Sequence, residues 1–284
     1  MRAMGLIVAV CIGAITCPQV IGRAQSAPEH VALPLDGPTL TDAQRLFYNA
    51  RYEAAGALAL VLRVPDLEDL ANDELRSSAL LFQLKALLDG SRDKDGALKN
   101  CATCPALIAE FLADIHRGQN TARITLRSNP GDEAALFFLG KLDLNYVWLQ
   151  LGPLHRRTGW DEYWEARRSL DAVLRQNPRH VRARVARAWI DYIVDTKMPW
   201  GSRWLLGGGN RKQALANVRD AAQLESEFFT HVEAEFALWD MEVRERDMAS
   251  ATDVARGLAH EFPDNRELAA FLEARVELTA GVHR

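Results

Sequence analysis

The stretch YWEARRSLDAVLRQNP, residues 163–178, combines a helical pattern with a helix stop. Its apolar residues recur every three or four positions, which places them on one face of an α-helix. Proline is disfavoured inside a helix and tolerated in the first turn of the next one, so the Asn-Pro pair ends this helix. Counting back from Pro178 by twelve, eight and five residues gives Ala166, Leu170 and Val173. The stretch therefore predicts a helix that packs closely against a neighbour.

The same pattern returns further along the chain. The identical offsets before Pro263, and before Ser226 where the proline is lost, again give small or apolar residues. These residues are Ala251, Ala255 and Leu258 before Pro263, and Ala214, Val218 and Ala221 before Ser226. No stretch shows sustained alternation of β-branched and polar residues. We therefore expect an all-α protein with no significant β-sheet.

This spacing resembles the tetratricopeptide repeat (TPR), in which small residues lie where two helices cross and a proline follows the second helix. The segment NPGDEAALFFLG, residues 129–140, adds the Leu-Gly pair of the first helix. The resemblance implies a right-handed solenoid of antiparallel helix pairs. About five pairs would fill residues 41–284, after an extended arm over 25–40, with a C-terminal capping helix over 265–279.

Two segments depart from the repeat. Pro130, Pro178, Ser226 and Pro263 are 48, 48 and 37 residues apart, whereas TPR units repeat every 34 residues. The spacing predicts two insertions, near 150–160 in LGPLHRRTGWDE and near 196–210 in MPWGSRWLLGGGN. The glycine-rich turn of the second insertion lacks the Gly-Lys-Ser/Thr of a phosphate-binding loop. It is similar to turns in exported TPR-like T-components of solute transporters.

The second insertion is unusually apolar for a connection between charged helices. Leaving large apolar side chains in water forgoes about 1.5 to 3 kcal/mol each. We therefore expect the insertion to fold back, with Trp200 and Trp204 packed near Trp189 and Tyr192, and with Arg203 at the rim facing an anionic ligand. Asn210 is typical of a residue that caps the next helix.

The N-terminus has the features of a secretory signal peptide over residues 1–24. A basic start is followed by an apolar run, Gly5–Thr16, that is too short to span a bilayer. Small residues favour cleavage between Ala24 and Gln25. Lipidation at Cys17 is the less favoured alternative, because Thr precedes that cysteine. The sequence thus predicts a periplasmic or secreted protein.

The charge of the chain argues against nucleic-acid binding. The sequence has 34 basic and 38 acidic residues, and removal of the two arginines in residues 1–24 leaves about −6. General binding to nucleic acid requires a net basic face. No second apolar run is long enough to span a membrane. We expect neither a nucleic-acid partner nor a membrane span in the mature chain.

Cys101 and Cys104 are the only cysteines after the signal segment. Pro105 stands where c-type haem attachment requires histidine, and two further zinc ligands are not evident. A thioredoxin-type pair requires a βαβ setting. In an oxidising compartment we expect a structural disulfide, and the scattered histidines indicate no metal site.

The TPR resemblance also implies a binding surface. In that family the first helix of each pair lines a concave groove. Grooves that bind peptides or carboxylates use cationic, amide and aromatic side chains. The residues at the corresponding offsets are Phe137, Lys141, Asn145, Arg182, Trp189, Tyr192, Glu233 and Asp240. The alternative is that Trp189 and Tyr192 belong to the core between helices, and that Arg187 and Asp191 form an ordinary i,i+4 pair.

We expect a binding or scaffold protein without cofactor, whose groove takes a protein or peptide partner. An alternative is a periplasmic accessory protein that binds a small organic anion for a transport system. A helical enzyme that uses His155, Arg156 and Arg157 is a remote alternative, because no nucleophile, base pair or metal set can be assembled. Ser91 and Lys94 match a serine-x-x-lysine pattern without its partner motifs.

Overall fold

The computed structural model describes residues 37–64, 69–88, 93–156, 158–198 and 200–282, without the side chains of Trp200, Ser202 and 276–282. These residues form α-helices and one 3-10 helix, and they contain no strand, which confirms the all-α prediction. The predicted signal peptide and most of the arm lie outside the described residues. The helices are α1 (Leu40–Tyr48), α2 (Tyr52–Val61), α3 (Leu70–Leu88), α4 (Lys94–Asn100), α5 (Cys104–Ser128), α6 (Glu133–Leu151), α7 (Trp160–Gln176), α8 (Val181–Lys197), η1 (Trp200–Leu206), α9 (Arg211–Ala222), α10 (Phe228–Glu245), α11 (Met248–Glu261) and α12 (Arg266–Val282).

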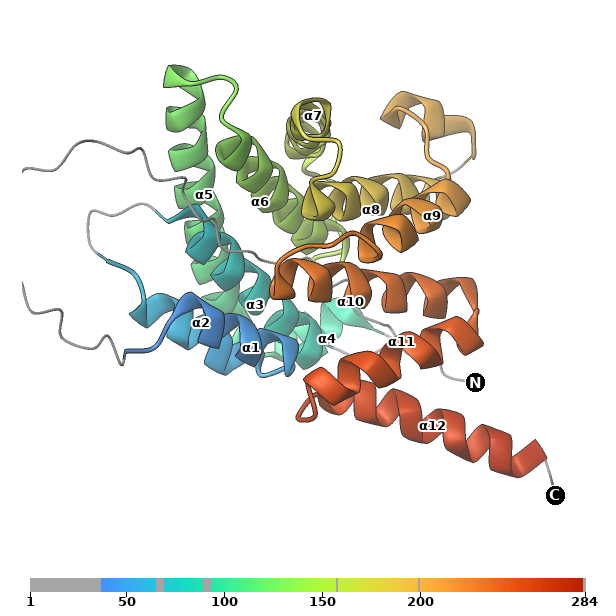
Figure 1. Cartoon of the computed structure of the whole chain (residues 1–284). Coiled ribbons are helices and arrows are strands. Elements are labelled where there is room, and N and C mark those ends of the chain that lie inside the picture. The colour runs from blue at the N-terminus through green and yellow to red at the C-terminus, as the bar shows by residue number, and fades with distance from the viewer. Residues whose placement is uncertain (1–36, 65–68, 89–92, 157, 199, 283–284) are drawn as a thin grey trace, which may run out of the picture.

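Most helices pack against the next one along the chain, from α1 in blue to α12 in red (Figure 1). In addition, α3 packs against α6, and α8 packs against α10. Local sequence signals start several of these helices. Asp132 accepts a hydrogen bond from the backbone N–H of Ala135 at the start of α6, and Asn210 accepts one from Gln213 at the start of α9. The predicted cap at Asn210 is thereby confirmed.

The small residues identified from the repeat pattern lie at helix crossings. Ala166, Leu170 and Val173 of α7 are fully buried. A Cβ atom on Gly140 of α6 would lie 2.9 Å from Leu170 Cγ, closer than carbon atoms approach without displacement. Glycine at this position therefore lets α6 and α7 cross at short distance.

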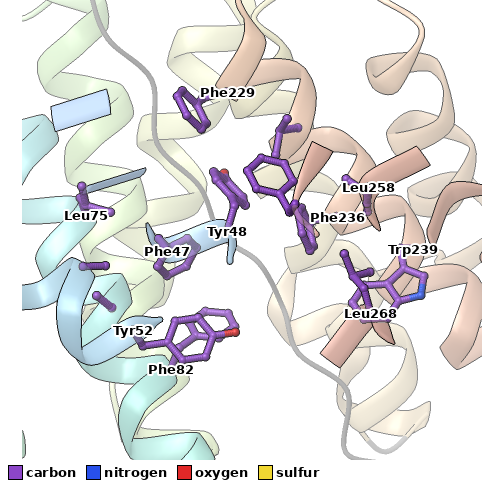
Figure 2. Packing of buried hydrophobic residues seen from close by; sticks show 14 of the residues in the cluster. Phe47, Tyr48, Tyr52, Leu75, Phe82, Phe229, Phe236, Trp239, Leu258 and Leu268 are labelled. Atoms are coloured by element: carbon purple, nitrogen blue, oxygen red, sulfur yellow. The ribbon is translucent and has the colours of Figure 1, made fainter. Parts of the chain in front are cut away.

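The first and last helices meet in one aromatic core (Figure 2). The Tyr48 ring of α1 stacks on Phe229 and Phe236 of α10, with centroid distances of 5.7 and 5.2 Å. Asn265 Nδ2 donates a hydrogen bond to the Tyr48 carbonyl at 2.7 Å. A linear stack of repeats, in which each unit contacts only its neighbours, does not predict this contact. It closes the chain of helices on itself.

Cys101 and Cys104 are joined by a disulfide at the start of α5, with 5.4 Å between their Cα atoms. Cys104 is the first residue of α5, and Pro105 follows it in the first turn. Proline is favoured there because the N–H that it lacks has no partner within the helix. The disulfide therefore fixes the chain where α4 ends and α5 begins, as the sequence predicts.

Candidate ligand-binding site

The cationic residues assigned to the groove lie in the interior and pair with carboxylates there. Lys141 Nζ of α6 donates to Glu233 Oε1 of α10 at 3.0 Å and lies 3.7 Å from Glu74 Oε1 of α3. Arg182 of α8 pairs with the same two carboxylates, with 3.4 Å between its Nη2 and Glu74 Oε2. All four side chains are nearly or fully buried. The network therefore ties α3, α6, α8 and α10 together.

The two carboxylates of this network differ in acidity. Burial raises the pKa of Glu74 to about 7, although Lys141 and Arg182 act in the opposite direction. Burial opposes ionisation of Glu233 as well, but Lys141 and Arg182 together hold its pKa below the ordinary value. Sequence reasoning missed Glu74, because α3 matches the repeat only loosely. When Glu74 is ionised, the two carboxylates balance the two cations, and an anionic ligand would then have to displace a buried carboxylate.

The other predicted groove residues also contact protein. Asn145 Nδ2 donates to the hydroxyls of Ser77 and Ser78 at 3.1 and 3.0 Å. The Arg182 guanidinium lies 4.5 Å from the centre of the Phe137 ring.

Trp189 is fully buried in the cluster that joins α8, α9 and α10. Tyr192 belongs to the same cluster and donates its hydroxyl to Glu245 at 2.8 Å. Asp240, the remaining assigned position, is buried and accepts from Arg244 Nε at 2.9 Å. These side chains thus belong to the core between helices, as the alternative expectation has it. Arg187 and Asp191 form the expected i,i+4 ion pair, 2.6 Å apart.

An apolar recess opens between the two predicted insertions, at the ends of α6, α7 and α8. Its empty volume is about 510 Å³, with open solvent at the mouth included. The first insertion contributes Leu151, Thr158, Gly159 and Trp160, and the second contributes Met198 and Leu206. The helices supply the remaining wall, which consists of Leu144, Val147, Trp148, Tyr163, Ile190, Ile193 and Val194. A recess lined by aliphatic and aromatic groups binds apolar ligand surface.

The second insertion is fastened to the fold beside the recess. Tyr163 donates its hydroxyl to the Leu206 carbonyl at 2.8 Å, and Arg167 donates to the carbonyls of Leu206 and Gly207 at 3.2 and 3.0 Å. A Cβ atom on Gly209 would lie 2.5 Å from the Asp191 carbonyl oxygen. Only glycine permits this approach of the segment to α8.

Arg203 is engaged by the protein and does not stand free at the rim. It pairs with Asp195 and donates to the Met198 carbonyl at 3.2 Å. Asp195 also accepts the backbone N–H of Arg211 at 3.0 Å. The side chain of Trp200 lies outside the described part of the structure.

The expectation that Trp204 packs beside Trp189 is wrong, because the Trp204 side chain is 73% exposed. The reason is the 3-10 geometry of η1, which has three residues per turn and places positions three apart on one side. Arg203 and Leu206 therefore share the side that faces the protein. Leu205 next to Trp204 is 56% exposed.

Comparison of the chain with protein-family models, with curated proteins and with solved structures finds no match. None of the helices in the described ranges is long and apolar enough to cross a membrane. Within the same ranges, no group of three His, Cys, Asp or Glu side chains is placed to hold a metal ion. The candidate site is therefore defined by its own geometry, which is the apolar recess.

Proposed function

We propose that this chain is a periplasmic or secreted binding protein built as a TPR-like solenoid of antiparallel helix pairs, with a binding and not a catalytic role. The observation that supports the proposal is the apolar recess to which both predicted insertions contribute lining residues. Each of the two insertions lengthens one repeat, and both line the same recess. Helix packing alone does not require such segments, which favours a role in binding. The ligand would place an apolar chain or ring in the recess, since burial of such surface is favourable by about 25 cal/mol per Å².

The recess favours the small-solute alternative over a peptide laid along the concave face. The residues expected to line that face are buried and contact one another, so a peptide has little access to them. An accessory role in the transport of a solute is consistent with such a pocket. A protein partner remains the second candidate, because Trp204 and Leu205 expose apolar surface next to the recess residue Leu206, and such patches mark contact sites.

A neutral apolar fluorophore tests the recess directly. N-phenyl-1-naphthylamine gains fluorescence when it leaves water, and we expect it to bind the protein at one site. Ile193→Trp fills the recess and should weaken this binding at least tenfold. Ile124→Trp is the matched control, because Ile124 lies on α5, is 42% exposed and does not line the recess. Equal binding by both variants at unchanged melting temperature would overturn the proposal.

The two candidate ligand classes give different results with variants of the exposed surface. Trp204→Ser and Leu205→Ser leave the recess lining in place, because neither residue contributes to it. They should not change fluorophore binding if the ligand is a small solute. Loss of a partner protein from these variants, with fluorophore binding retained, would favour the second candidate.

A further inference from the structure

Lys85 of α3 is a partly buried cation without a direct polar partner. Its side chain makes no hydrogen bond or ion pair with any residue that the structure describes. Its ammonium group lies 4.6 Å from the centre of the Phe82 ring and 6.0 Å from the centre of the Trp148 ring. Aromatic faces attract a cation, but they do not supply the acceptors that an ammonium group loses on leaving water.

The charged groups that face Lys85 already have partners. They are Asp240 and Arg244 of α10 and Glu267 of α12. Asp240 accepts from two nitrogens of Arg244, at 2.9 and 3.3 Å, and Glu267 accepts the hydroxyl of Tyr52 at 3.2 Å. Burial lowers the pKa of Lys85 to about 8, with Arg244 acting in the same direction and the two carboxylates against it. An additional acceptor at Lys85 would therefore be stabilising.

Trp148 connects Lys85 with the recess. This residue of α6 lines the recess and also packs against three separate core clusters of the protein. Its indole Nε1 is buried and has no hydrogen-bond acceptor among the described residues. An unpaired ammonium group thus lies beside an unpaired indole side chain whose ring forms part of the recess wall. Lys85 does not itself line the recess, but its ammonium group lies 6.0 Å from the centre of the Trp148 ring, which does.

We propose that the ligand of the recess is an amphiphile, an apolar chain that ends in a carboxylate, and that Lys85 binds the carboxylate beside Trp148. This inference rests on the proposed function, because it assumes that the apolar part occupies the recess. A carboxylate supplies the acceptor oxygens that Lys85 lacks, and charge-assisted hydrogen bonds are stronger than neutral ones. Arg203, which the sequence suggested for an anion, is paired with Asp195.

The test is displacement of N-phenyl-1-naphthylamine by octanoate and by octanol, which have the same chain length and differ in charge. In the unaltered protein at pH 7, we expect octanoate to displace the fluorophore at a concentration at least fivefold below that of octanol. Lys85→Met should remove this preference, and Lys85→Arg should keep it. Lys99→Met is the control, since Lys99 is exposed on α4 and does not line the recess.

The pH dependence gives a second measurement that needs no variant. Octanoate stays ionised between pH 7.5 and 9.5, and Asp240, whose pKa burial raises to about 7, is largely ionised there, whereas Lys85 loses its proton near pH 8. The preference for octanoate should therefore fall as the pH rises through this interval, while displacement by octanol stays constant. Equal displacement by the two compounds at pH 7, or an unchanged preference in Lys85→Met, would overturn the inference.

The two failures can be told apart. If octanol displaces the fluorophore and Ile193→Trp weakens its binding, the recess binds apolar ligands whatever the result at Lys85. If neither compound displaces it and Ile193→Trp has no effect, the proposed function fails, and the inference fails with it. Should Lys85→Met not fold, Lys85→Arg and the pH profile decide the outcome.

Discussion

Lys141 Nζ donates a hydrogen bond to Glu233 Oε1 at 3.0 Å, although 92 residues separate them and both side chains are fully buried. Glu74 and Arg182 complete the network around this pair. Burying two charges costs several kcal/mol per ion, which their attraction offsets only when the geometry and hydrogen bonding are good. We therefore expect the pair to constrain which helices meet more than it adds to stability.

Removal of Lys141 should reveal the free-energy cost of a buried carboxylate that lacks its cation. Lys141→Met leaves Glu74 and Glu233 with one cation between them, so we expect the free energy of unfolding to fall by about 3 to 5 kcal/mol at pH 8. The loss should be smaller at pH 5.5, because Glu74 then holds a proton. Urea denaturation measures both values. Arg256→Met, which removes an exposed pair with Asp253, should change stability by less than about 0.5 kcal/mol. A similar effect for both variants would contradict a structural role for the network.

Asp143 should make the protein less stable as the pH rises. Burial, and then the nearby charge of Glu165, raise its pKa from 3.8 to about 9. The folded state therefore keeps a proton that the unfolded chain releases, and stability falls between about pH 4 and 9, by at most about 1.4 kcal/mol per pH unit. Asp143→Asn has no such proton to keep.

The measurement is urea denaturation of both proteins at pH 5, 7 and 8.5. We expect the stability of Asp143→Asn relative to the unaltered protein to increase at each step. The control is Asp253→Asn, because that side chain is exposed and should show no such trend. A constant difference across the three pH values would show that Asp143 is ionised in the folded protein.

Two helical glycines should respond to alanine in opposite directions. At Gly140, the new methyl group would meet Leu170 Cγ at 2.9 Å, so we expect Gly140→Ala to lower stability by about 1 to 3 kcal/mol. At Gly257 of α11 no atom lies within 4 Å, and alanine is the better helix former, so Gly257→Ala should raise stability by about 0.5 to 1 kcal/mol. Thermal unfolding of both variants checks the pair. Equal shifts would mean that α6 and α7 do not cross at Gly140.

The Cys101–Cys104 disulfide should contribute little to global stability. Its loop is short, and the chain-entropy model gives only about 2 kcal/mol for such a loop. We expect the double variant Cys101→Ser/Cys104→Ser to fold, with a loss no larger than this. Intact mass after alkylation without reductant should show that neither thiol is modified in the unaltered protein. Two alkylated cysteines would contradict the disulfide.

The helices could be predicted because their signals are local. Ala166, Leu170 and Val173 have the spacing of one helix face, Pro178 follows the helix, and all three side chains are buried where the pattern places them. The repeat length alone predicts the two insertions, and residues from both predicted segments line the recess. That they line a common recess could not be predicted, because the recess depends on how the ends of α6, α7 and α8 sit in space.

The partners of the predicted groove residues depend on long-range contacts. Glu74 faces Lys141 and Arg182 because α3 packs against α6. Tyr48 and Asn265, 217 positions apart, likewise meet only in the folded protein. No periodicity in the sequence reports such a contact. For the same reason the sequence does not predict the surroundings of Lys85, which come from α6, α10 and α12. The sequence can therefore predict that a cation lies on an inner helix face, but it cannot predict whether that cation has an ion-pair partner.

Neighbouring residues of η1 should respond very differently to truncation. Leu206 is buried against the recess and its carbonyl accepts from Tyr163 and Arg167, so Leu206→Ala should lower the free energy of unfolding by about 2 to 4 kcal/mol and weaken fluorophore binding. Trp204 is 73% exposed, so Trp204→Ala should change stability by less than about 0.5 kcal/mol. Thermal unfolding and the fluorescence titration measure both effects on the same samples. A loss of several kcal/mol in Trp204→Ala would mean that this indole packs against the fold, and unchanged stability in Leu206→Ala would mean that the insertion is not fastened beside the recess.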